Sequence, residues 1–351
     1  MNAYFEKMLC QFIEGKVDFE IDFAQYPDEL YRYRSCNDNN FDSLENDYLW
    51  MVHPSSYKDP FDALVSVDKE DLADAFEEDI INHIAEFFYF ILPPQGMCES
   101  KNGITFTEVK TVAENIFFSA SGKYDKNQAI ENIKRYFQIL STEQQIIVTN
   151  AFAELYNSNN MLSLKESFND IIEQTASGSR ENYMTCCLTK RKDNRNMWEN
   201  YAEDYTGFVI RYSFDKDNKF AQTIRCLFEV EYFDNIAPLD MRYLLDIHSR
   251  KMFYGEEPDL VAATLPMLKR ILVKNSDYKS EEEWRFIAGK SENNKVPFPF
   301  ASAVYAGYKI SDESLNKLKE ICKKKDIPLY KQELDSIGGR FVYYPVDLSE
   351  D

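Results

Sequence analysis

The sequence is poor in the residues that build the commonest catalytic and cofactor sites. It has only three histidines, and His53, His83 and His248 stand far apart, without the spacing of a metal site. No Gly-x-Ser-x-Gly motif occurs, so a Ser-His-Asp hydrolase has little support. The lysine-containing phosphate loop and the Gly-x-Gly-x-x-Gly turn are also missing, which excludes the usual phosphate-binding loops.

Membrane-spanning and disulfide signals are missing as well. No run of about eighteen apolar residues occurs, and the N-terminal segment carries acids and no long apolar core. The seven cysteines are odd in number and form no Cys-x-x-Cys pair, which argues against a disulfide framework. We therefore expect a cytoplasmic protein with no membrane partner.

Acidic residues, in contrast, are in excess, and apolar residues are sufficient for a packed core. The formal net charge is −20, and hydrophobic residues make up 44% of the chain and aromatic residues 15%. Such a chain repels phosphate backbones, so general nucleic-acid binding is not expected. Net charge does not describe a single cleft, and a local basic pocket stays open.

Two kinds of pattern alternate along the chain. Residues 67–182 repeat the apolar spacing of amphipathic helices and predict an inserted helical subdomain. Residues 1–66 and 183–351 mix strands with short helices in irregular order, which predicts a single α+β core domain. We expect a mixed or antiparallel central sheet with flanking helices. The predicted strands cover residues 29–35, 47–53, 183–189, 208–214, 226–233, 282–289, 300–308, 327–334 and 339–346.

The first candidate segment for chemistry is the strand Glu29 to Ser35. Alternation places Tyr31 and Tyr33 on one face and Arg32 and Arg34 on the other. Arginine is well suited to bidentate phosphate recognition, whereas a structural ion pair is the equally weighted alternative.

A second candidate is the loop after the next strand. Tyr48 and Tyr57, with Asp59 and Asp62, are predicted to wall a pocket, although Asp59 is also explained as an Asx turn.

The third candidate is a short helix predicted to begin near Asp193 or Asn194. Met197, Trp198, Tyr201 and Tyr205 fall on one helical face, so most of this aromatic surface is expected to pack against the sheet. Tyrosine hydroxyls at the helix edge remain available to a cleft.

The fourth candidate is the acidic run before a late strand. Glu281 and Glu283 would share one face of an extended chain with Arg285. A carboxylate placed there could stabilise a cation-like transition state or act as a base. The alternative is a solvated acidic face.

Five segments occur in one order: LYRYRS, LWMVHPSSYKDPFDA, MWENYAEDYTGFVIRY, EEEWRFI and VYAGY. In this combination the chain resembles the prokaryotic family of domains of unknown function numbered 2971, over most of residues 29–66 and 183–345. The MWxxYAxxxxGF and ExEWR patterns are the specific ones. The chain departs from the family at Tyr57 and Lys58, where members usually carry Phe-Asn.

The layout of this family remotely resembles the ADP-ribosyltransferase fold. That resemblance implies NAD as substrate, cleaved at its nicotinamide–ribose bond, and an effector or toxin role in anti-phage defence and abortive infection. It leaves the acceptor and a phage protein trigger open. By this hypothesis Glu283, supported by Glu281, is catalytic, and no metal takes part. The residues assigned to NAD are Arg32 or Arg34 for phosphate and Tyr48, Tyr57, Trp198 and Tyr201 for the pocket.

Two other functions compete with this hypothesis. A non-catalytic sensor or interaction module would bind a nucleotide or a phage protein through the same cleft or through the helical insertion. A nuclease-like effector is disfavoured by the net charge and by the lack of a metal-binding cluster of acids and lysine.

Overall fold

The computed structural model describes residues 1–16, 20–68, 172–214, 220–240, 259–335 and 337–349, with short pieces at 100–101, 104–105 and 242–244 and single residues 142, 170, 217, 247 and 257. The chain divides into two compact units. The first comprises Met1–Val65, Ser177–Ala237 and Leu265–Asp351, and the second comprises Ser66–Ala176 and Pro238–Thr264.

Most of the second unit lies outside the described residues. Its described strands, β3 (Ser100–Lys101) and β4 (Ile104–Thr105), pair antiparallel. The helices predicted over residues 67–182 fall almost entirely outside the described part. The division into a core domain and an inserted subdomain therefore stays a prediction.

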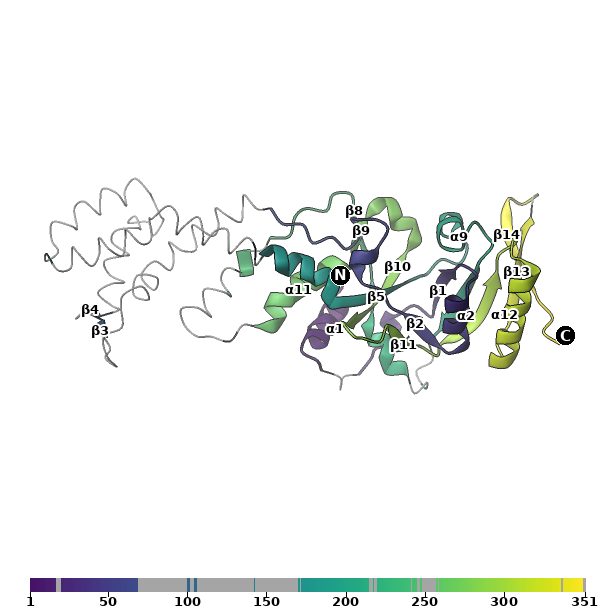
Figure 1. The fold of residues 1–351 in the computed structure, drawn as a ribbon, viewed down its shortest axis with the longest axis horizontal. Coiled ribbons are helices and arrows are strands. Elements are labelled where there is room, and N and C mark those ends of the chain that lie inside the picture. The colour runs from purple at the N-terminus through teal and green to yellow at the C-terminus, as the bar shows by residue number, and fades with distance from the viewer. Residues whose placement is uncertain are drawn as a thin grey trace. The chain divides into compact units, whose positions relative to one another are not determined.

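The first unit is built on an eight-stranded sheet with the order β14-β13-β12-β6-β1-β5-β10-β7. Every neighbouring pair is antiparallel except β12 and β13. The prediction of an α+β fold with a mixed, mostly antiparallel sheet is confirmed (Figure 1). The strands are β1 (Glu29–Arg34), β5 (Tyr183–Thr189), β6 (Phe208–Ser213), β7 (Leu227–Glu229), β10 (Glu283–Gly289), β12 (Ala301–Ala306), β13 (Leu329–Asp335) and β14 (Arg340–Pro345).

The two faces of this sheet differ in what covers them. One face, here called the core face, carries Leu30, Cys186 and Trp284 and belongs to the main apolar cluster. That cluster also takes in buried side chains from four helices: α1 (Ala3–Ile13), α2 (Asp38–Glu45), α11 (Leu260–Ile271) and α12 (Asp312–Lys325). The opposite face, here called the recess face, packs against α9 (Arg195–Tyr201), whose Met197 and Trp198 are buried.

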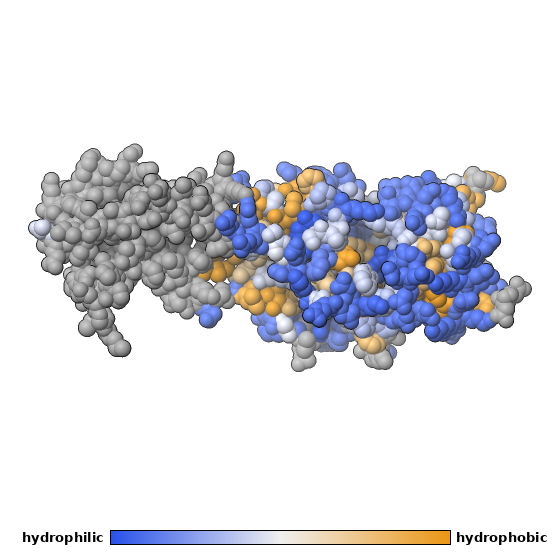
Figure 2. All heavy atoms as spheres, in the orientation of Figure 1, coloured by the Kyte–Doolittle hydropathy of each residue, from blue (hydrophilic) through white to orange (hydrophobic). Residues whose placement is uncertain are grey.

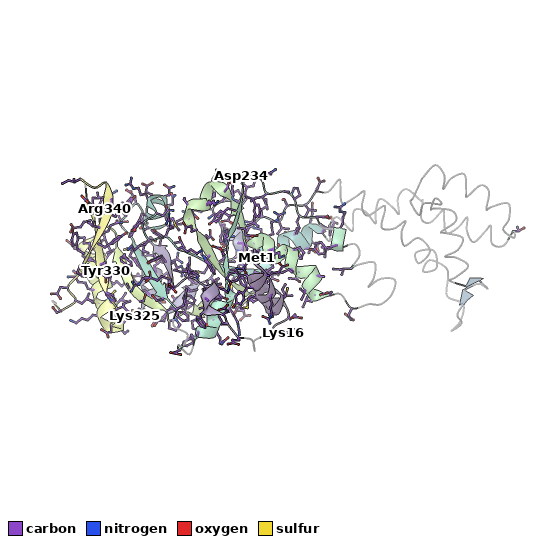
Figure 3. The ribbon with its side chains drawn as sticks, turned by 180° about the vertical axis from the view of Figure 1, so that it is seen from behind. Met1, Lys16, Asp234, Lys325, Tyr330 and Arg340 are labelled. Atoms are coloured by element: carbon purple, nitrogen blue, oxygen red, sulfur yellow. The ribbon has the colours of Figure 1, made fainter. Side chains whose placement is uncertain are left out.

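The helices start where their capping residues predict. Asn194 caps α9 by accepting from the amide of Met197, and Ser311 caps α12 by accepting from the amide of Ser314. Helix α1, which the sequence analysis did not predict, is capped in the same way by Asn2. In a view from behind, Lys325 at the end of α12 lies at the same end of the unit as Tyr330 of β13 and Arg340 of β14 (Figure 3).

Several short elements lie outside the eight-stranded sheet, and two of them, β9 and η4, carry residues of the site described below. These are β2 (Tyr48–Trp50) paired with β11 (Lys295–Pro297), β8 (Glu231–Phe233) paired with β9 (Val273–Asn275), and the 3₁₀ segments η1 (Phe23–Gln25), η2 (Pro54–Ser56), η3 (Ala221–Cys226) and η4 (Ser276–Glu281). The single strand predicted over 226–233 is wrong. It is split at Val230, because the amide of Val230 bonds to Glu283 of β10 and the next amide bonds to Leu272.

The surface agrees with the composition. Figure 2 shows hydrophilic residues over most of the visible face of the described unit, with smaller apolar patches between them. No helix in the described part of the chain has the length and apolar character needed to cross a membrane.

Candidate functional site

Five buried charged side chains meet on the recess face. The ammonium of Lys274 lies 2.7 Å from a Glu281 oxygen and 2.8 Å from a Glu283 oxygen. The guanidinium of Arg285 lies 2.6 Å from the other Glu283 oxygen. Asp62 closes the cluster, at 2.6 Å from Arg285 and 3.7 Å from Lys274. Three carboxylates against two cations leave one net negative charge in this ion cluster when all five groups are ionised.

The regular backbone conformation is interrupted at Glu282, and both neighbouring glutamates point inward. Segment η4 ends at Glu281, Glu282 adopts a left-handed φ of 44°, and β10 begins at Glu283. The side chain of Glu282 points outward and pairs with Arg191 at 3.2 Å. The sequence left open which of Glu281 and Glu283 faces the interior, and the structure shows that both reach Lys274.

The two glutamates have opposite pKa shifts. Burial raises the pKa of Glu281 above its ordinary value, because its attraction to Lys274 only partly offsets the loss of hydration. Burial alone would also raise the pKa of Glu283, but Arg285 and Lys274 outweigh it and hold that pKa well below its usual range. Glu283 therefore stays ionised, whereas Glu281 is the better proton acceptor.

Solvent comes closest to this cluster at the exposed residues Cys187 of β5 and Tyr201 of α9. Cys187 is exposed, yet the surrounding protein is dense enough that burial raises the pKa of its thiol well above the usual value. From the exposure of Cys187 beside these buried charged side chains we infer a recess at this point of β5. The Tyr57 hydroxyl lies 3.5 Å from its sulfur, and the hydroxyl of Tyr201, which is 44% exposed, donates to Glu281 at 3.2 Å. We call this site, formed by Tyr57, Cys187, Tyr201 and Glu281, the Cys187 recess.

Four predicted site residues thus come together, namely Glu281, Glu283, Tyr57 and Tyr201. The guanidinium of Arg285 lies 5.3 Å from the centre of the Tyr57 ring, a cation–π distance that fixes the ring. Tyr201 is the last residue of α9 and points at Glu281 rather than into the sheet. The predicted helical face that included Tyr205 is therefore wrong, since α9 ends before it and Tyr205 lies in a left-handed turn with φ 68°.

The two predicted arginines lie elsewhere. Residues paired directly across strands share a face, and Tyr31 pairs with Thr189, which pairs with Glu283. Arg32 and Arg34 alternate with Tyr31 and therefore point to the core face. A single cleft that contains these arginines together with Glu283 does not fit this register.

Two of the aromatic residues predicted to line the pocket, Trp198 and Tyr48, are held in place by contacts within the fold. Trp198 is fully buried, and its indole N–H donates to the carbonyl of Lys192 at 3.1 Å. Tyr48 is buried in β2, its hydroxyl donates to Asp42, and the ammonium of Lys295 lies 4.3 Å from its ring centre. Among the described residues, no hydrogen bond or ring contact links either side chain to the residues of the Cys187 recess, so these positions do not support their assignment to NAD.

The site also includes residues that the sequence analysis did not assign to catalysis or to NAD. Asp62 was predicted only to wall a pocket, and Lys274 and Cys187 were not assigned a role. Asp62 itself gives no signal, because an acid in a loop rich in turn residues is unremarkable. The available signal was Arg285, since a buried arginine in β10 requires a carboxylate partner. Among the described residues, no group of three or more histidine, cysteine, aspartate or glutamate side chains is arranged to hold a metal ion.

The opposite pKa shifts predict different pH profiles for two glutamine variants. Because the folded-state pKa of Glu283 is lowered, its ionisation stabilises the protein above the unfolded pKa of about 4.3, and this contribution is lost as pH falls below that value. Glu283→Gln should therefore lower the free energy of unfolding more at about pH 7 than at about pH 4. Glu281→Gln should lower the free energy of unfolding less at about pH 7 than at about pH 4. The pKa of Glu281 is raised in the folded protein, so its ionisation opposes folding.

Urea unfolding of both variants and the wild-type protein at the two pH values measures these differences. Equal costs for the two variants at both pH values would contradict the assignment of opposite shifts.

A family model matches part of the chain. The model of a family described as a protein of unknown function (DUF2971) matches residues 197–286, a segment that starts in α9 and ends in β10. It contains Tyr201, Lys274, Glu281, Glu283 and Arg285, five residues of the recess and the ion cluster. No curated protein and no solved structure matches the chain. Over residues 197–286, the chain is therefore similar to the family of proteins of unknown function DUF2971.

Proposed function

We propose that the Cys187 recess is the active site of an NAD-using, ADP-ribosyltransferase-like enzyme. The observation that carries the proposal is the meeting of Glu281 and Glu283 on Lys274, with opposite pKa shifts, beside a solvent-accessible recess. A pair of carboxylates whose environments separate their pKa values is the arrangement that acid–base catalysis and charge stabilisation need.

The ion cluster suits a positively charged substrate. The nicotinamide ring of NAD is cationic, and breaking its bond to ribose sends the bonding electron pair to the ring and leaves an oxocarbenium-like ribose. One net negative charge next to the recess stabilises that positive charge in the transition state. The rings of Tyr57 and Tyr201 provide aromatic surface against which the nicotinamide can stack.

The contacts favour a division of roles between the two glutamates. Glu283 is 2% exposed and both its oxygens are bonded to cations, so it acts as a positioning residue that holds Lys274 and Arg285. One of the two oxygens of Glu281 bonds only to the hydroxyl of the half-exposed Tyr201. It takes the proton of the attacking hydroxyl as the new bond to ribose forms. This assignment of roles is the reverse of the sequence-based hypothesis, in which Glu283 was catalytic and Glu281 supported it.

The acceptor of the ADP-ribosyl group is water or a hydroxyl of a macromolecule, and the setting proposed with the family resemblance is anti-phage defence. The rival function is a non-catalytic module that binds a nucleotide or a phage protein. Its support is that all three carboxylates of the cluster are already paired with cations. Turnover separates the two functions.

The test is nicotinamide release from NAD by the full-length protein, with and without cell extract as a source of acceptor. Glu281→Gln should lower the rate by about 100-fold or more, the usual contribution of a positioned base. Glu282→Gln is the matched control, because it makes the same chemical change one residue away at an outward-facing side chain. Its rate should equal that of the wild-type protein.

Three results decide the outcome. Release that only the Glu281 variant loses supports the proposal. Equal loss in both variants, or no release by folded wild-type protein in either condition, overturns it and favours the binding module.

A further inference from the structure

Arg32 is a buried cation without a carboxylate. It lies on the central strand β1, is 4% exposed, and donates from one terminal nitrogen to the carbonyl of Trp50 at 3.1 Å. Its Nε and its other terminal nitrogen are buried and have no hydrogen-bond acceptor among the described residues. A buried guanidinium in this state costs free energy, because it has lost hydration without gaining an anionic partner.

Two titratable groups that interact with Arg32 cannot neutralise its charge. They are the thiol of Cys186 and the hydroxyl of Tyr212, whose pKa values are both raised by burial, with Arg32 only partly opposing the shift. Both groups are therefore neutral near pH 7. Among the described residues, Arg32 therefore has polar neighbours but no carboxylate within ion-pair distance.

Arg34 repeats the pattern two residues along the same strand. Alternation places it on the core face beside Arg32, it is half-buried, and its Nε is also buried without an acceptor. Among the described residues neither arginine forms an ion pair, although the chain has 60 acidic residues against 40 basic ones. In so acidic a chain, two neighbouring arginines without a carboxylate need a reason.

We propose that Arg32 and Arg34 form an anion-binding site for a phosphoryl group on the core face of the sheet. Arginine presents planar donors that match a phosphate oxygen pair, and Arg34 is the more exposed of the two, so it gives the anion its approach. Because the strand register places these side chains on the face opposite to Glu283, the site is separate from the Cys187 recess.

The experiment is thermal unfolding of the full-length protein in increasing inorganic phosphate, with sodium chloride holding the ionic strength constant. A ligand that binds only the folded state raises Tm with concentration. We expect phosphate to raise the Tm of the wild-type protein and not that of Arg34→Gln. Arg211→Gln is the matched control, since Arg211 lies on the adjacent strand β6, points to the recess face and already pairs with Glu29 at 3.3 Å. It should keep the full phosphate response.

Arg32→Met gives a second readout that a structural arginine would not produce. Removing an unpaired buried charge should raise the Tm measured without phosphate and abolish the phosphate response. A lower Tm for Arg32→Met without phosphate would mean that Arg32 has a structural role, and would overturn the proposal.

A parallel titration with ADP distinguishes free phosphate from the phosphoryl group of a nucleotide as the source of the anion. A larger shift with ADP at equal concentration, lost in Arg34→Gln, assigns the site to a nucleotide, and a smaller one assigns it to free phosphate. Absence of any shift with either anion, or a shift that survives in Arg34→Gln, overturns the proposal.

Discussion

Replacing Lys274 with methionine is expected to lower the free energy of unfolding by about 3 to 5 kcal/mol, the usual cost of removing one partner from a buried ion pair. Lys274 is 5% exposed and is the only side chain that bonds to both Glu281 and Glu283 among the described residues. Methionine fills nearly the same volume, so the cost comes from the carboxylates rather than from a cavity: Glu281 loses its cation, and Glu283 keeps only Arg285. Urea unfolding near neutral pH measures it.

Two further variants make this prediction specific. Lys269→Met removes a lysine whose pair with Glu6, at 2.7 Å, is partly exposed on both sides, and it should cost about 1 kcal/mol or less. Adding Glu281→Gln to Lys274→Met should recover part of the loss, because one unpaired carboxylate is then neutral. A cost for Lys274→Met no larger than that for Lys269→Met would contradict the assignment of the ion cluster as a buried network.

The elements of this unit could be predicted from the sequence because their signals are local. The alternation in residues 29–35, the Asn194 and Ser311 caps and the apolar run at 183–189 each specify one element within a few residues. The break at Val230 could not be predicted in this way. It depends on hydrogen bonds to Glu283 and Leu272, which are distant in sequence.

The site was only half predictable for the same reason. Residue types pointed to Glu281, Glu283 and the tyrosines, since carboxylates and aromatic rings next to a strand are chemically informative. Which residues share a face depends on strand order, and Arg32 was assigned to the same pocket because the pairing of β1 with β5 was unknown. Glu282 shows the limit most directly: alternation placed Glu281 and Glu283 on one face, but it could not predict the left-handed backbone of Glu282 between η4 and β10.

The turn after α9 connects the fold to the recess. Glu203, Asp204 and Tyr205 are three consecutive residues with positive φ, a strained arrangement for side chains other than glycine. The turn is held by the amide of Gly207, which bonds to Ala202 at 2.9 Å, and by that of Lys309, which bonds to Tyr205 at 3.1 Å. It fixes the end of α9, and therefore the position of Tyr201 over Glu281.

Gly307→Ala is expected to destabilise the protein by about 3 kcal/mol, at the upper end of the cost of overpacking. A methyl group at Gly307 would lie 2.1 Å from the carbonyl oxygen of Tyr205 and 3.1 Å from that of Gly207, and backbone atoms cannot rotate away as a side chain can. Because the amide of Gly307 also bonds to Gly207 at 2.9 Å, relief of the clash requires the turn to move. That movement should carry Tyr201 away from Glu281 and lower nicotinamide release by the folded variant.

The control for this prediction is Gly289→Ala at the end of β10, where an added methyl group meets no atom within 4 Å. It should unfold at the same urea concentration as the wild-type protein or a slightly higher one, since alanine restricts the unfolded chain. If Gly307→Ala behaves like Gly289→Ala in both unfolding and nicotinamide release, the turn does not hold Tyr201 in place. The other contacts of α9, such as the hydrogen bond from its cap Asn194 to the carbonyl of Ser280, would then have to position the recess.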